Sequence, residues 1–95
     1  MKTIITENFK YKLADQIEYI AKDKPNAAQN FRKQLISRIK EIHILPYKHR
    51  KSIFFDEDIY RDLIYKGYII VYKIDLPNQT IIIFGFTKYE DNPFK

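Results

Sequence analysis

Apolar residues recur every three or four positions in two consecutive stretches of the chain, which is the spacing of one face of an α-helix. The first stretch predicts a helix over residues 8–22, and the second predicts a helix from 25 to about 45. The link between them is short, so we expect an antiparallel helical hairpin. The residues that define the two apolar stripes are Phe9, Leu13, Ile17, Ile20 and Ala21, then Ala28, Phe31, Leu35, Ile39, Ile42 and Leu45.

Residues at the ends of these stretches support the same boundaries. Thr6 or Asn8 is suited to cap the first helix, because a short polar side chain can accept a hydrogen bond from a free backbone N–H group. Pro25 fits the first position of the second helix, where its missing N–H costs nothing. Pro46 is expected to end that helix.

Four further segments are predicted as strands, because β-branched and aromatic residues dominate them. These strands cover residues 2–6, 59–65, 68–74 and 80–86. Turn residues at 66–67 and 75–79 join the last three strands into a meander. Gly85, near the end of the last strand, indicates a bulge or a close approach of another backbone.

The order of these elements is β-αα-βββ, which predicts an α+β fold. The antiparallel helical hairpin is expected to pack on one face of a small, mainly antiparallel sheet. With 95 residues, the chain has the length of a single domain, 1–95.

Composition narrows the possible chemistry. The chain has no Cys, two Gly and two His, so it lacks a thiolate metal site and a glycine-rich phosphate loop. We therefore expect no metal and no small-molecule cofactor. No apolar run is long enough for a signal peptide or a membrane span, which predicts a soluble, cytoplasmic protein without a membrane partner. The net charge of +5 suits a partner rich in phosphate or carboxylate groups.

The densest positive segment is the predicted loop that contains Lys48, His49, Arg50 and Lys51, beside the aromatic Tyr47. It is either a contact surface for a nucleic acid or another target, or a solvated connection between helix and sheet. Carboxylates also gather at Asp56, Glu57, Asp58 and Asp62. A cation site there is conceivable, but the spacing does not match an EF-hand loop, and a solvated turn explains it more simply.

The element order, the length and the run IYRDLIYKGYIIVYKID…IIIFGFTKYEDNP together resemble the RelE/ParE superfamily of toxins from bacterial type II toxin–antitoxin systems. The resemblance covers essentially the whole chain. It is most specific in the paired-strand segment, where the residues Tyr60 to Ile64 are followed by Gly67-Tyr68, Val71-Tyr72 and Lys88.

Within that superfamily, RelE-like members cut mRNA on the ribosome, whereas ParE-like members act on DNA gyrase without a nuclease site. The nuclease branch has an Arg directly after the Gly-Tyr pair, where this chain has Ile69, and Lys residues in the preceding strand, where it has Tyr60 and Asp62. An apolar side chain cannot stabilise a phosphorane, and a carboxylate would repel a phosphate. The residues left for a nuclease are Arg61, Lys66, Lys88 and Tyr89, and their convergence in one basic pocket would favour that activity.

The resemblance therefore implies a ParE-like toxin that arrests growth by binding DNA gyrase, and a cognate antitoxin that neutralises it. A ribosome-dependent endoribonuclease, with the ribosome and mRNA as partners, is the alternative. A scaffold that binds only its partner is a third. In either toxin reading an acidic antitoxin would suit the basic chain.

Overall fold

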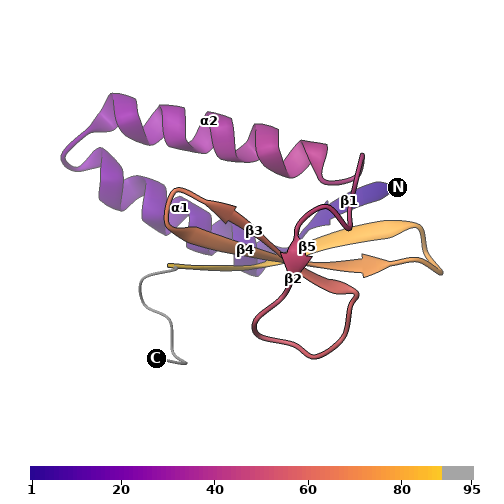
Figure 1. Ribbon diagram of the computed structural model, residues 1–95. Coiled ribbons are helices and arrows are strands. Elements are labelled where there is room, and N and C mark those ends of the chain that lie inside the picture. The colour runs from indigo at the N-terminus through magenta and orange to yellow at the C-terminus, as the bar shows by residue number, and fades with distance from the viewer. Residues whose placement is uncertain (89–95) are drawn as a thin grey trace.

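A computed structural model describes residues 1–88 (Figure 1). Two helices lie on one side of a five-stranded sheet, which confirms the predicted α+β class and the β-αα-βββ order, with one short strand added. The elements are β1 (Lys2–Ile5), α1 (Glu7–Ala21), α2 (Pro25–Glu41), β2 (Arg50–Lys51), β3 (Tyr60–Tyr65), β4 (Tyr68–Asp75) and β5 (Thr80–Lys88). Within residues 1–88, neither helix is long and apolar enough to cross a membrane.

The strands lie in the order β1-β5-β4-β3-β2. Strand β1 is parallel to β5, with Lys2 opposite Thr80, and the other neighbouring strands are antiparallel. The first strand described therefore pairs with the last one. Both helices follow β1 in the sequence and lie over the sheet.

The start of each helix follows the residues expected from the sequence. The Thr6 hydroxyl accepts a hydrogen bond from the Phe9 backbone N–H at 3.2 Å, so Thr6 rather than Asn8 caps α1. Pro25 occupies the first turn of α2.

The end of α2 differs from the prediction, because the helix stops at Glu41 and does not continue to about residue 45. The Ile42 N–H donates to the Ile39 carbonyl, and the Ile44 N–H to that of Glu41, so the last turn tightens into three-residue spacing. Ile42 is buried, but Leu45 is 61% exposed. Leu45 continues the apolar period of the sequence without facing the core.

The basic segment was predicted to be a loop, but it contains the short strand β2. Arg50 pairs with Asp62 and Lys51 pairs with Arg61, which extends the sheet by one edge strand. Two exposed basic residues carry no apolar alternation, so the sequence gives no sign of this strand.

The main core lies between the helices and the sheet, as the apolar stripes predict. Phe9 of α1 meets Phe86 of β5 edge-on at 5.7 Å between ring centroids, and Phe31 of α2 meets Tyr65 and Tyr68 at 5.5 and 5.2 Å. The other large buried members of this core are Leu13, Leu35, Ile39, Ile42, Leu63, Ile70, Tyr72, Ile74, Ile81 and Ile83.

The predicted irregularity at Gly85 is confirmed. The β4–β5 register shifts between Val71 and Tyr72, which are paired with Gly85 and Ile83. A Cβ atom on Gly85 would lie 2.9 Å from the Val71 Cβ, closer than two carbon atoms tolerate. Only glycine fits this close approach.

Candidate functional site

The sheet face away from the helices carries the three positions at which the nuclease branch would have cations. Asp62 is paired with Val71, and Ile69 with Ile64, so these side chains point away from the helices, as does Tyr60 by strand alternation. The segment between β2 and β3 folds under this face (Figure 1).

Asp62 is the most unusual of the three, because its carboxylate is fully buried. Its Oδ2 atom accepts a hydrogen bond from the Ile53 backbone N–H at 3.1 Å and lies 3.4 Å from the Arg50 guanidinium. Its Oδ1 atom has no hydrogen-bond partner among residues 1–88. Asp62 thus holds the β2–β3 connection to the sheet and is out of reach of a substrate.

The other two positions are closed by packing. Ile69 is 1% exposed. The Tyr60 ring stacks on Phe55 with centroids 4.1 Å apart, and Phe84 meets both rings edge-on. None of the three positions therefore offers a cation to a phosphate at this face.

Arg61 lies on the other face of β3, the one toward the helices, and is paired with Tyr72 of β4. Its guanidinium donates to the carbonyl oxygens of Asp58 at 2.7 Å and His49 at 3.2 Å, and lies 4.9 Å from the centroid of the Tyr47 ring. The side chain is 15% exposed. Arg61 therefore fastens three segments together, in the manner of a structural guanidinium.

The basic segment is divided between structural and exposed residues. His49 is half-buried with its ring edge-on to Tyr72, and burial, followed by the nearby cations Arg38 and Lys48, lowers its pKa. Arg50 bonds Asp62, whereas Lys48 and Lys51 are exposed. Tyr72 donates its hydroxyl proton to the Pro46 carbonyl, and its burial raises the pKa of the phenol. The segment is thus held firmly while two ammonium groups face solvent.

The remaining candidates lie at the other end of the sheet. Lys66 is in the β3–β4 turn, with its Nζ atom 5.5 Å from the Tyr65 ring, and Lys88 is paired with Tyr68. At ~3.3 Å per residue, Lys66 is about 17 Å along the strand from Arg61. Tyr89 lies outside the described residues. Among those described, Arg61 is thus not brought together with Lys66 and Lys88.

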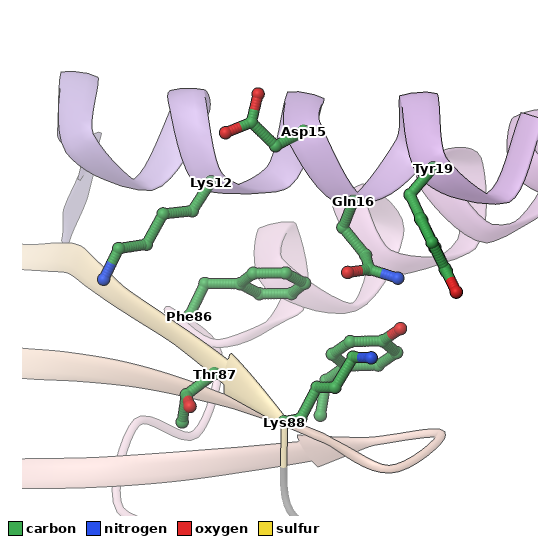
Figure 2. A pocket seen from close by; sticks show the side chains of 8 residues that line it. Lys12, Asp15, Gln16, Tyr19, Phe86, Thr87 and Lys88 are labelled. Carbon is green, nitrogen blue, oxygen red and sulfur yellow. The ribbon is translucent and has the colours of Figure 1, made fainter. Parts of the chain in front are cut away.

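Lys88 instead borders a hollow of about 430 Å³ between α1 and β5 (Figure 2). Its Nζ atom lies 5.7 Å from the ring centroid of Tyr19, and Lys12 descends toward the strand nearby. Sequence reasoning missed this hollow. The exposed Lys12 and Tyr19 fall within two turns of α1, but nothing in the sequence places them beside Lys88. Among residues 1–88, no group of three His, Asp or Glu side chains could hold a metal ion.

A comparison with protein families decides the relationship. The family model described as "ParE toxin of type II toxin-antitoxin system, parDE" matches residues 3–92. The chain belongs to the ParE toxin family. A search of curated proteins found no match.

This assignment confirms the predicted superfamily resemblance and narrows it. The match begins at the second residue of β1 and extends beyond the end of β5. A ParE-family toxin is one half of a toxin–antitoxin pair, so the family implies an antitoxin partner.

Proposed function

We propose that this ParE-family toxin arrests bacterial growth in the cytoplasm by binding DNA gyrase, without cutting nucleic acid, and that a cognate antitoxin neutralises it. The observation that carries the proposal is the closed helix-free face. Asp62 is buried in a bond with Arg50, Ile69 is 1% exposed and Tyr60 is stacked on Phe55.

The positions of the remaining cations support the same conclusion. Metal-independent cleavage of RNA requires several cations aimed at one phosphate, together with an acid and a base. Arg61 is committed to backbone carbonyls at one end of the sheet, while Lys66 and Lys88 lie at the other end. Arg61 therefore cannot act on the same phosphate as Lys66 and Lys88.

The exposed part of the basic segment is the proposed target contact. Lys48 and Lys51 face solvent, while His49 and Arg50 keep the segment in place through Tyr72 and Asp62. Cations held on a rigid loop lose little entropy when they meet an acidic surface, and they speed the encounter.

Induced expression of the full chain, followed by plasmid-topology analysis and mapping of mRNA ends, tests the proposal. We expect loss of negative supercoiling and double-strand breaks, with mRNA ends unchanged. Purified chain should also inhibit supercoiling by purified gyrase. Cleavage of ribosome-bound mRNA would overturn the proposal in favour of the nuclease, and growth without arrest would leave only a binding scaffold.

A pair of charge variants tests the contact surface. Lys48→Gln combined with Lys51→Gln should weaken gyrase inhibition about tenfold, because each exposed charge contributes up to ~1 kcal/mol. The matched control, Lys33→Gln with Lys40→Gln, removes the same charge from the exposed face of α2 and should leave inhibition unchanged. Equal effects of the two pairs would assign the role to net charge alone.

A further inference from the structure

The connection between α2 and β2 exposes three apolar side chains within four consecutive residues (Figure 1). Ile44 is 65% exposed, Leu45 is 61% exposed and Tyr47 is 45% exposed. Ile44 and Leu45 are the most exposed large aliphatic side chains of residues 1–88. A single exposed leucine is ordinary, but a cluster of this kind is typical of a surface that another molecule covers. We call residues 44–47 the apolar turn.

Backbone and side-chain hydrogen bonds hold the apolar turn in one shape. The Lys48 N–H donates to the Leu45 carbonyl at 3.0 Å, which closes the turn on itself. The buried Tyr72 donates its hydroxyl proton to the Pro46 carbonyl, which ties the turn to the middle of the sheet. A segment that is already fixed loses little conformational entropy when it binds, so its exposed side chains are well prepared for a contact.

The Tyr47 ring is also held in place. The Arg61 guanidinium lies 4.9 Å from the ring centroid, and it donates to the His49 carbonyl at 3.2 Å. The Arg61 side chain is only 15% exposed, so the ring rests against a cation that is itself well packed. Tyr47 therefore adds a preset aromatic surface to the two aliphatic side chains.

Positive charge follows the apolar turn directly. Residues 42–55 contain Lys48, Arg50 and Lys51 and no carboxylate. Lys48 and Lys51 are exposed. An apolar centre with a cationic border complements a surface of the opposite kind, which is an apolar pocket bordered by carboxylates.

We propose that the apolar turn anchors the target contact, with Ile44 and Leu45 inserted into an apolar pocket of the target protein. Carboxylates at the edge of that pocket pair with Lys48 and Lys51. This inference rests on the proposed function, because it takes gyrase as the target, and it names the residues that supply most of the affinity. Exposed charges contribute little each, whereas apolar side chains contribute in proportion to the area that they remove from water.

A protein pocket suits the apolar turn better than an anionic membrane does. Segments that lie on a membrane usually bury the apolar face of a long amphipathic helix. Here only three apolar side chains project from a short, rigid turn. A small fixed projection matches a preformed pocket in shape as well as in chemistry.

Two leucines provide a matched pair of variants for the test. Leu45→Ser changes the apolar turn, and Leu76→Ser makes the same change in the β4–β5 turn, where Leu76 is 48% exposed. Leu45→Ser should weaken inhibition of purified gyrase about tenfold, and Ile44→Ser combined with it about fiftyfold. Leu76→Ser should leave inhibition unchanged. Equal inhibition by the two leucine variants would overturn the proposal.

A conservative variant separates a lost contact from a lost fold. Leu45→Met keeps the apolar surface and should inhibit gyrase as the unsubstituted chain does. Thermal unfolding of Leu45→Ser should match that of Leu76→Ser, because both side chains are exposed. A loss of inhibition with Leu45→Met as large as that with Leu45→Ser would contradict an apolar anchor.

The salt dependence separates the apolar turn from its charged border. High salt should reduce the effect of Lys48→Gln combined with Lys51→Gln, because ions screen exposed charges. The ratio of inhibition between the unsubstituted chain and Leu45→Ser should persist, because apolar burial is not screened. A ratio that disappears at high salt would overturn the proposal.

Other occupants of the apolar turn give different results. Self-association in sedimentation that Leu45→Ser abolishes would show that a second copy covers the turn. Anionic phospholipid vesicles that bind the unsubstituted chain but not Leu45→Ser would show that a membrane covers it. Either result would overturn a pocket on the target.

Failure of this inference is distinguishable from failure of the proposed function. If the unsubstituted chain and Leu45→Ser inhibit gyrase alike, only the anchor is refuted. If the unsubstituted chain does not inhibit gyrase, the proposed target is refuted and the anchor with it.

Discussion

The two ends of the central strands carry positive charge in opposite ways. At one end, the Arg61 guanidinium bonds two carbonyl oxygens and covers the Tyr47 ring, and Arg50 bonds the buried Asp62. At the other end, Lys12 and Lys88 border an open hollow without an ion pair among the described residues. Cations of the first kind hold the fold together, and cations of the second kind remain available to a partner.

This difference follows from the type of side chain as well as from its position. A guanidinium has several donors in a fixed plane and can bond separate carbonyls at once, whereas an ammonium on a flexible stem is more often solvated. A positive residue in this sheet is therefore not in itself a sign of a binding site. The predictions below test the comparison.

The largest effect is expected for Asp62→Ala. The substitution leaves the part-buried Ile53 N–H without its acceptor and removes one partner of Arg50, so the free energy of unfolding should fall by about 3 kcal/mol. Urea denaturation measures it. Asp58→Ala is the control, because Asp58 is exposed and lies in the same connection. It should lower the free energy of unfolding by less than about 0.5 kcal/mol. Equal costs would mean that the carboxylate of Asp62 does not anchor the connection.

Gly85→Ala tests the bulge that separates the two ends. The added methyl group would lie 2.9 Å from the Val71 Cβ, which cannot move without the backbone. Overpacking of this kind should cost about 2 kcal/mol. In a Val71→Ala background the cost should become much smaller, which a double-mutant cycle in urea would detect. An unchanged cost would show that the close approach is not the cause.

Arg61→Gln and Lys88→Gln compare the two ends directly. Loss of the bonds to Asp58 and His49 and of the contact with Tyr47 should lower the free energy of unfolding by about 1–2 kcal/mol. Lys88→Gln should change it by less than about 0.5 kcal/mol. If thermal and urea unfolding show similar losses for both, the two cations are not used differently.

The smallest effect is a pH dependence at His49. Its pKa is lowered in the folded chain, mainly by burial, so the unfolded chain takes up a proton first as the pH falls below about 6.5. Stability should therefore fall between neutral pH and pH 5, and His49→Gln should flatten that slope. His43→Gln is the control, because His43 is exposed. An unaltered slope for His49→Gln would place the proton uptake elsewhere.

Most of the fold could be predicted, because the spacing of apolar residues and the identity of the turn residues indicate each helix and strand from neighbouring positions. The stripes of α1 and α2, the Thr6 cap and the Pro25 start are all read from neighbouring residues. The end of α2 was misplaced because Leu45 continues the apolar period although it is exposed, and the helix tightens at Ile42. The spacing of apolar residues alone does not distinguish a core residue from an exposed one that falls at the same helical spacing.

The candidate site was less predictable because it depends on contacts between distant segments. Strand alternation correctly put Arg61 and Asp62 on opposite faces. It could not show that Asp62 is buried against Arg50, or that Arg61 is held by carbonyls of two separate segments. The hollow beside Lys88 was missed for the same reason, since it joins α1 to the far end of β5.

The pairing of β1 with β5 has a consequence for folding during synthesis on the ribosome. Lys2 meets Thr80, so β1 leaves the ribosome long before its sheet partner β5 is synthesised. Until then no complete sheet covers the apolar face of the α1–α2 hairpin. The nascent chain therefore exposes hydrophobic surface of the kind that chaperones bind. A ParE-family toxin built in this way completes its sheet only after β5 has been synthesised.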